Sequence, residues 1–188
     1  MIRTFIAIDV PDEVKNMISR AQENLRRIGS DRISWTRSQS IHLTLKFLGD
    51  VNEEEISDIA NRIETALLDF SYFDIQTTSP GGFPRIQKPR VLWLGIDGGD
   101  ALINIADAAD KGLSKLGFDR EKKIFNPHLT VGRVKSLSPN SELPFRFSSM
   151  DFGSVRWTAE EVNVMASELK PTGAVYTVLD TIPLKFTK

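Results

Sequence analysis

Two stretches of this chain decide its fold: His42-Leu43-Thr44-Leu45-Lys46-Phe47-Leu48 and His128-Leu129-Thr130-Val131-Gly132-Arg133-Val134. The chain has two histidines, and both stand in the tripeptide His-Leu-Thr. Alternating apolar residues predict that each stretch is a β-strand. Side chains alternate between the two faces of a strand, so His42 and Thr44 share one face about 6.5 Å apart, and His128 and Thr130 do the same. The apolar residues between them would anchor each strand on the core.

The surroundings of these stretches repeat as well. Ile6-Ala7-Ile8-Asp9 resembles Leu94-Gly95-Ile96-Asp97, 88 positions later, and a helix expected over 12–28 resembles one expected over 100–116, again 88 later. The His-Leu-Thr tripeptide recurs after 86 positions. Three features at nearly one offset predict a duplicated unit of strand, helix and histidine-bearing strand. If a pseudo-two-fold axis relates the halves, the two His-Thr pairs can face each other across one cleft.

Periodicity assigns the remaining elements. Apolar residues at three- and four-residue steps predict helices over 12–28, ended by Gly29, from Asn52 to Leu67, and over 100–116. Strands are expected over 2–10, 32–36, 41–48, 72–79, 90–97, 128–134, 147–156, 160–168 and 174–184, with a Gly/Pro turn at 80–84 and a Ser/Pro-rich loop at 136–144. Many strands with three interspersed helices predict the α+β class with mainly antiparallel sheet.

Composition sets outer limits on function. The 188 residues are 40% hydrophobic and 26% charged with a net charge of -1, which is typical of one globular domain and predicts a single domain over 1–188. An anionic partner must therefore meet a local basic patch, because the chain as a whole is not basic. The chain has no cysteine, which excludes disulfides, thiolate metal sites and thiol nucleophiles and is compatible with the expected cytoplasmic location. No apolar run approaches the length of a membrane span, so no membrane association is expected.

The two His-Thr pairs suit phosphoryl transfer. Two imidazoles with ordinary pKa values near 6.5 supply a general base and a general acid near neutral pH. Two threonine hydroxyls supply hydrogen-bond donors for the oxygens of the reacting phosphorus centre. This scheme requires no metal ion and no cofactor, and none is expected. The pattern alone does not decide which histidine is the acid.

Three basic residues are candidates for contacting a phosphate. Strict alternation places Lys46 on the face of His42 and Thr44. The same alternation places Arg133 on the face opposite His128, unless a bulge near Gly132 turns it back. Arg90 follows the Gly/Pro segment and is a third candidate.

Other interpretations of the histidines remain. A single histidine beside a strand is more often a surface or core residue than a catalyst, and only the matched pair favours catalysis. A metal site is weaker, because no His-x-x-x-His or carboxylate spacing accompanies the pair.

The chain resembles a known family at these residues: the 2H phosphoesterases, and within them the RNA 2′,3′-cyclic phosphodiesterases long labelled 2′-5′ RNA ligases, which carry His-x-Thr-x motifs. The resemblance covers nearly the whole chain. It rests on Arg3–Asp9, His42–Gly49, Gly82–Pro84 with Pro89–Trp93, Phe125–Thr130, and Ser167–Pro171 through Tyr176.

This resemblance implies two similar lobes of antiparallel sheet with helices packed outside and a central groove. It implies that His42 donates a proton to the leaving ribose oxygen and that His128 accepts one from water. Thr44 and Thr130 would hold the phosphate oxygens while a cyclic phosphate at an RNA end or on a small nucleotide opens to a 2′-phosphomonoester. The same groups could instead run the reverse reaction and join RNA ends, although water at about 55 M competes with a bound hydroxyl. A module that binds RNA ends without turnover is a further alternative. A monomer is expected. The region 136–146 departs from the family, which often has a helix where this chain has a short Ser/Pro-rich loop.

Overall fold

Two antiparallel sheets form the framework of the protein. The structure is a computed structural model that describes residues 1–28, 31–170 and 173–186. One sheet has the strand order β3-β1-β8-β9 and the other β2-β6-β5-β4-β7. The strands are β1 (Ile2–Ile8), β2 (Arg32–Trp35), β3 (Leu43–Val51), β4 (Phe73–Phe83), β5 (Val91–Asp97), β6 (His128–Ser136), β7 (Arg156–Ala159), β8 (Glu161–Lys170) and β9 (Gly173–Pro183). The expected α+β class with two lobes of antiparallel sheet is confirmed.

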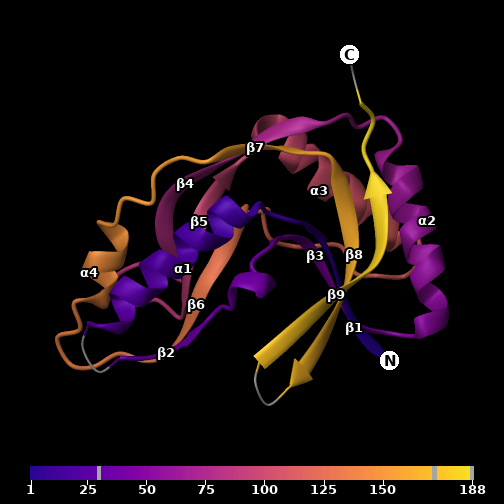
Figure 1. Cartoon of the computed structure of the whole chain (residues 1–188). Coiled ribbons are helices and arrows are strands. Elements are labelled where there is room, and N and C mark those ends of the chain that lie inside the picture. Colours follow the sequence, from indigo (N-terminus) through magenta and orange to yellow (C-terminus); the bar gives the residue numbers. More distant parts are fainter. Residues whose placement is uncertain (29–30, 171–172, 187–188) are drawn as a thin grey trace.

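The helices cover the outer faces of these sheets (Figure 1). They are α1 (Asp12–Arg26), α2 (Ile56–Leu67), α3 (Gly99–Ser114) and the short α4 (Leu143–Ser148), with 3-10 turns η1 (Ser38–Ser40) and η2 (Glu53–Glu55). The helices α2 and α3 pack against each other, and α2 also lies against β8 and β9 of the first sheet. The helix α1 is tied to the second sheet, because the Gln22 side chain donates to the backbone oxygen of Val131 at 2.9 Å. Each central strand is thus followed by a helix that packs on the other lobe.

The register of the strands shows the internal repeat directly. Ile8 of β1 pairs with Leu43 of β3, and Leu94 of β5 pairs with Leu129 of β6. The pair β1–β3 therefore matches the pair β5–β6 with a shift of 86 residues in both strands, which is also the spacing of the two His-Leu-Thr tripeptides. The expected shift of 88 for the segment Ile6–Asp9 is wrong by two residues. Apolar residues alternate along a strand, so an alignment displaced by two residues also matches apolar with apolar positions.

Both motif strands carry a β-bulge at the same place. The pairing of β3 with β1 passes over Leu45, and the pairing of β6 with β5 passes over Val131, again 86 positions later. An inserted residue reverses the alternation of side chains beyond it. The residues after each bulge therefore point to the face opposite the one that strict alternation predicts.

Several expected elements need correction. The segment 80–84 is not a simple turn, because β4 continues through Pro80, Gly81 and Gly82 to Phe83. The expected strand 147–156 is wrong, since α4 ends at Ser148 and β7 begins at Arg156. The expected loop over 136–144 therefore runs into α4, which begins at Leu143. Gly29, the expected end of the first helix, and Pro171 lie outside the described residues.

Gly81 has a specific packing role. A β-carbon at this position would collide with the six-membered ring of Trp93. The absence of a side chain therefore lets the Trp93 indole lie across β4. This explains why a Gly-rich segment forms a strand here and places Trp93 beside the second histidine motif.

Candidate active site

The first histidine is enclosed by aromatic rings from its own sheet. The ring of His42 lies 4.7 Å from that of Phe5 on β1 and 4.9 Å from that of Tyr176 on β9, measured between centroids. Phe5 and Tyr176 also contact each other, with centroids 5.1 Å apart. Aromatic rings from β1 and β9 therefore hold the imidazole directly before β3. The sequence marks Tyr176 only as the end of the family resemblance, and its place beside His42 was not predicted.

The second histidine has a matching aromatic setting in the other sheet. The ring of His128 meets the ring of Phe83 edge-on at 5.0 Å and lies 6.1 Å from that of Trp93. Its Nδ1 atom lies 2.7 Å from the backbone oxygen of Asn126. A carbonyl oxygen only accepts, so Nδ1 carries the proton of this bond. In the neutral ring, Nε2 is then left with a free lone pair.

Burial lowers the pKa of both imidazoles. For His42, desolvation outweighs a hydrogen bond to the backbone of Ser40 and lowers the pKa to about 4. For His128, desolvation again lowers the pKa, the bond to Asn126 raises it, and the charge of Arg133 lowers it further. Both rings are therefore neutral at pH 7 when no ligand is present.

The two threonines of the motifs lie on the same faces as the histidines. Thr44 pairs with Ala7 of β1, and Thr130 pairs with Trp93 of β5. Both side chains are partly exposed, whereas Leu43 is fully buried. The alternation expected for this part of each strand is what the structure has, and each histidine shares its accessible face with a hydroxyl.

Arg133 lies on the face of His128 because of the bulge at Val131. Beyond the bulge it pairs with Val91, which shares a strand face with Trp93. The face expected from strict alternation is wrong for this residue, and the bulge expected as the exception is present. Burial raises the pKa of Tyr176, and the Arg133 charge lowers it in part. The charge of Arg133 thus lowers the pKa of His128 in one lobe and that of Tyr176, which contacts His42, in the other.

The expected position of Lys46 is wrong for the same physical reason. The bulge at Leu45 turns Lys46 away from His42 and Thr44, and its side chain is 2% exposed. Its Nζ atom donates to Oδ1 of Asp110 at 2.6 Å and to the backbone oxygen of Asp119 at 2.7 Å. The ammonium is engaged inside the protein and does not reach a phosphate held by the histidines.

Arg90 stands just before β5 and is exposed. Its backbone nitrogen donates to the oxygen of Phe83, and its backbone oxygen accepts from the nitrogen of Val134. Within the described ranges its guanidinium has no ion-pair partner. In the same ranges the Arg90 side chain makes no hydrogen bond to either histidine motif, so its expected phosphate contact stays a prediction.

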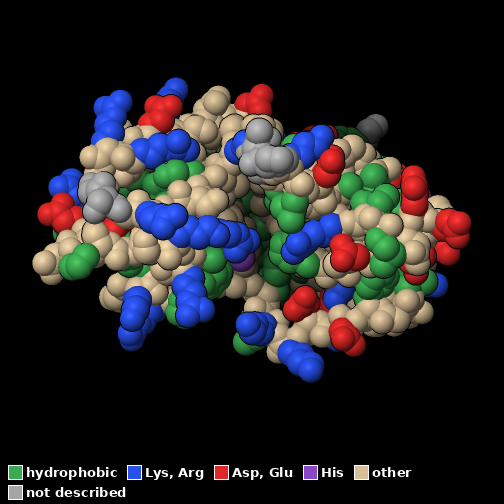
Figure 2. All heavy atoms as spheres, turned by 90° about the horizontal axis from the view of Figure 1, so that it is seen from below, with side chains coloured by type: hydrophobic (Ala, Val, Ile, Leu, Met, Phe, Trp, Pro, Cys, Tyr) green, Lys and Arg blue, Asp and Glu red, His purple; other side chains and the backbone are tan. Residues whose placement is uncertain are grey.

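The space between the lobes is hollowed on one face of the molecule. Figure 2 shows histidine side-chain atoms at this hollow, with Lys and Arg side chains gathered beside them. Close to the second motif, the backbone nitrogen of Thr36, just after β2, donates to the oxygen of Val131 at 3.1 Å and extends the pairing of β2 with β6. Among residues 1–28, 31–170 and 173–186, no group of three His, Cys, Asp or Glu side chains could hold a metal ion. No helix in these ranges is long and apolar enough to cross a membrane.

Comparisons with known proteins give the same fold and a family. The model of the 2′-5′ RNA ligase superfamily matches residues 10–171. The RNA 2′,3′-cyclic phosphodiesterase of Thermotoga maritima is 38% identical over 178 residues, which are 95% of this chain and 93% of that one. The protein of the same name from Methanothermobacter thermautotrophicus is 32% identical over 186 residues, covering 97% and 99% of the two chains.

Solved structures resemble this one over nearly their whole length. The protein TT0787 of Thermus thermophilus superposes with a TM-score of 0.80 at 27% identity, covering 99% of this chain and 100% of that one. Escherichia coli LigT, crystallised with 3′-AMP, gives a TM-score of 0.76 at 22% identity, covering 97% and 98%. At this identity the likeness to LigT speaks for the fold alone.

Proposed function

The chain belongs to the 2′-5′ RNA ligase superfamily and is an enzyme of its RNA 2′,3′-cyclic phosphodiesterase group, and we propose that two histidines perform its reaction without a metal ion. The observation that carries the proposal is the repeat itself. Thr44 and Thr130 stand at equivalent positions of β3 and β6, which pair with the same register and the same bulge. Each threonine follows its histidine by two residues, with His42 directly before β3 and His128 at the start of β6. Duplicated acid-base and hydroxyl groups are what the two sides of one phosphate require.

The proposed reaction is hydrolysis of the cyclic phosphate to a 2′-phosphomonoester. His128 Nε2 takes a proton from a water molecule as the water oxygen bonds to phosphorus. The bond from phosphorus to the ribose 3′-oxygen breaks, and His42 gives that oxygen its proton. Thr44 and Thr130 donate hydrogen bonds to the two non-bridging oxygens, whose charge grows in the transition state.

The hydrogen bond of His128 supports its role as the base. Donation from Nδ1 to the Asn126 oxygen keeps the proton on that nitrogen and leaves Nε2 available to accept. The nearby Arg133 also disfavours a second proton on this ring. A base that is neutral before the reaction starts is ready to take the proton from water.

The lowered pKa of His42 is compatible with the role of acid once substrate is bound. An anionic phosphate next to the ring favours the imidazolium and raises its pKa. The aromatic enclosure by Phe5 and Tyr176 then makes the imidazolium a strong donor, since desolvation favours loss of its proton. Arg133 shares the face of His128 and would pair with a non-bridging oxygen. Lys46 has no direct role in this proposal.

The test uses a dinucleotide that ends in a 2′,3′-cyclic phosphate, assayed in the presence of EDTA. Wild-type protein is expected to turn over without added metal and to give the 2′-phosphomonoester. His42→Ala and His128→Ala are each expected to lose at least about 100-fold in kcat. The proposal fails if either variant turns over at nearly the wild-type rate, or if EDTA abolishes activity and a divalent metal restores it.

The remaining proposals concern the state in which the protein works. Residues 1–188 act as one bilobal domain, because buried side chains of both sheets belong to one continuous apolar cluster. We expect a monomer in the cytoplasm. Sedimentation at micromolar concentration would reveal a dimer if this expectation is wrong.

A further inference from the structure

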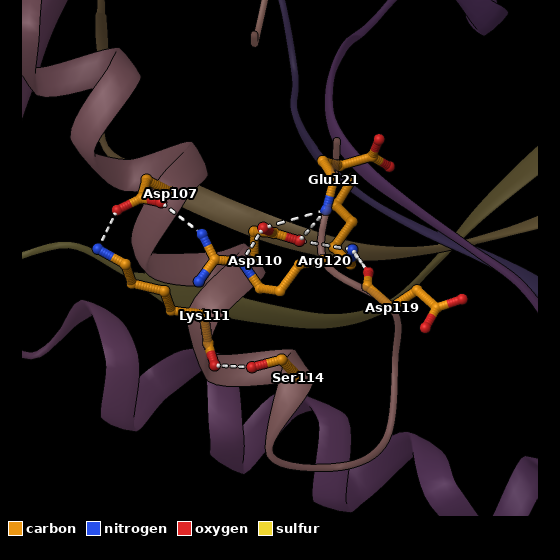
Figure 3. A network of polar contacts seen from close by, with 8 residues as sticks. Asp107, Asp110, Lys111, Ser114, Asp119, Arg120 and Glu121 are labelled. Atoms are coloured by element: carbon orange, nitrogen blue, oxygen red, sulfur yellow. Dashed lines mark hydrogen bonds and ion pairs between the residues drawn. The ribbon is translucent and has the colours of Figure 1, made fainter. Parts of the chain in front are cut away.

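A buried ion pair joins the first motif strand, β3, to the helix α3, which precedes the loop that leads to the second motif. Lys46 follows the first motif on β3, and Asp110 lies on α3 with its carboxylate side chain 9% exposed. Asp110 is bound at Oδ1 by Lys46 at 2.6 Å and at Oδ2 by Nε of Arg120 at 2.5 Å. Figure 3 shows this network around the end of α3 and the loop that follows it.

The network holds three consecutive residues of that loop. The Asp119 backbone oxygen accepts from Lys46, the Arg120 side chain binds Asp110, and the Glu121 backbone nitrogen donates to both oxygens of Asp110 at 3.2 and 3.3 Å. These donors also lower the pKa of Asp110, outweighing the burial that would raise it. The carboxylate is therefore ionised, and its charge is met by the ammonium, a guanidinium and a backbone N–H.

The same loop leads to the second catalytic motif. The sheet holds the chain again from Pro127, whose oxygen accepts from the nitrogen of Ile96. Over residues 119–125, the hydrogen bonds that the described part of the chain provides are those to Lys46 and Asp110 and one from Arg120 to Asp107 on α3. The loop also stands over a pocket of about 440 Å³ that separates part of it from β3. The ion pair is thus what fixes the loop to the first motif strand.

We propose that the Lys46–Asp110 pair is a positioning device that sets the loop 119–126 and, through the Asn126 carbonyl, the orientation of the His128 ring. The proposal rests on the proposed function for its catalytic consequence. Asn126 is exposed and stands between the network and β6, so the path of the loop decides where its carbonyl points. A base displaced by about 1 Å can cost on the order of 100-fold in rate.

The variant for the test removes both charges together. Losing one partner alone would leave a buried charge unpaired and endanger folding, whereas replacing both by apolar residues of similar size often leaves stability unchanged. Lys46→Met with Asp110→Leu is therefore the main variant. The control is the exposed ion pair between Glu142, just before α4, and Arg146 on α4, whose Nη2 and Oε2 atoms lie 2.7 Å apart. In the control variant Glu142 is replaced by Gln and Arg146 by Met.

The first readout is catalytic. With a cyclic-phosphate dinucleotide, the Lys46/Asp110 double variant is expected to lose roughly 10- to 100-fold in kcat with KM changed less than about threefold, because the substrate contacts remain and the base is misplaced. The Glu142/Arg146 variant is expected to keep both constants. Unchanged kcat in a folded Lys46/Asp110 variant overturns the proposal.

The second readout does not depend on activity. Protein labelled with ¹⁵N-histidine has only two ring systems, His42 and His128, so each serves as the reference for the other. The double variant is expected to shift or broaden the His128 ring signals by loss of the single tautomer and to leave those of His42 in place. If the wild type proves inactive on the dinucleotide, the proposed function fails while this measurement still decides the positioning role; identical His128 signals overturn it.

A milder variant covers the case in which the double variant does not fold. Arg120 is 46% exposed and binds Oδ2 of Asp110, so Arg120→Ala removes one of the three loop attachments without opening the core. It is expected to produce a smaller change of the same kind, roughly two- to fivefold in kcat, with the His128 signals affected more than those of His42. Wild-type values of both quantities in this variant count against the proposal.

Discussion

The His42 half and the His128 half of the site share a backbone and differ in the side chains around it. In each half the histidine is followed by a threonine and a bulge, and the backbone two residues earlier, at Ser40 and at Asn126, raises the pKa of the imidazole. The first residue after each bulge that returns to the site face differs in chemistry. It is Phe47 in one half and Arg133 in the other.

The shared backbone and the unequal side chains determine different properties of the site. The duplicated backbone sets the geometry, because equal register and equal bulges place the two His-Thr pairs in equivalent positions. The unequal side chains then give the halves different electrostatics: the cation Arg133 shares the face of the second imidazole, and the apolar Phe47 holds the equivalent strand position in the first half. A symmetric scaffold can therefore carry an asymmetric reaction in which one imidazole accepts a proton and the other donates one.

The largest effects should come from the shared part of the two halves. Thr44→Val and Thr130→Val keep the shape of the side chain and remove the hydroxyl. Each is expected to lower kcat about 100-fold, since losing one preorganised donor to a developing oxyanion costs about that much. Steady-state kinetics on a cyclic-phosphate dinucleotide measures this, and circular dichroism checks the fold. A loss confined to one of the two variants would show that the halves do not hold the phosphate equally.

The next effect should come from the position at which the halves differ. Arg133→Met is expected to lower kcat/KM by roughly 10- to 100-fold, the range for a hydrogen bond to a charged group. Phe47→Leu is the matched control, because it changes the equivalent residue of the other half. It is expected to change kcat/KM less than about threefold. Equal effects of the two changes would contradict the assignment of the cation to one side only.

The positions of the catalytic candidates could be predicted from the sequence up to the bulges and not beyond them. His42, Thr44, His128 and Thr130 precede the bulges, and simple alternation gives their faces correctly. Lys46 follows a bulge, and alternation gives the wrong face. Leu45 and Val131 are ordinary apolar strand residues, so nothing in their identity marks the inserted position.

Longer-range packing limited the prediction of the fold in a similar way. The Pro80-Gly81-Gly82 segment has turn composition, yet it forms the end of β4 because the Trp93 ring occupies the space above Gly81. The helix over Leu143–Ser148 was missed because its six residues are too few to show a helical period. The role of Asp110 was hidden for another reason: its partners Lys46 and Arg120 come from a distant strand and a later loop.

The pH dependence of kcat/KM and kcat tests whether burial lowers the pKa of both imidazoles. The profile of kcat/KM reports the free enzyme, in which burial lowers the pKa of His42 to about 4 and lowers that of His128 as well. Both limbs of the bell are therefore expected below about pH 6.5, with about a tenfold fall per pH unit above the basic limb. The profile of kcat should lie at higher pH, because bound phosphate raises the pKa of a neighbouring imidazole. A kcat/KM optimum above pH 7 would contradict the burial argument.

The smallest effect concerns folding and distinguishes the two histidines. A histidine with a lowered pKa in the folded chain favours the neutral form, so its contribution to stability is complete above the unfolded pKa near 6.5 and is lost as pH falls toward the folded pKa. Because the pKa of His42 in the folded chain is about 4, its titration should lower the free energy of unfolding by about 1 kcal/mol between pH 7.5 and pH 5.5. Urea unfolding at pH 7.5 and 5.5 is expected to show this loss in the wild type and a smaller loss in His42→Gln. His128→Gln should reduce the loss less, because burial lowers the pKa of His128 less far than that of His42. An equal reduction by both variants would mean that the two halves desolvate their imidazoles to the same degree.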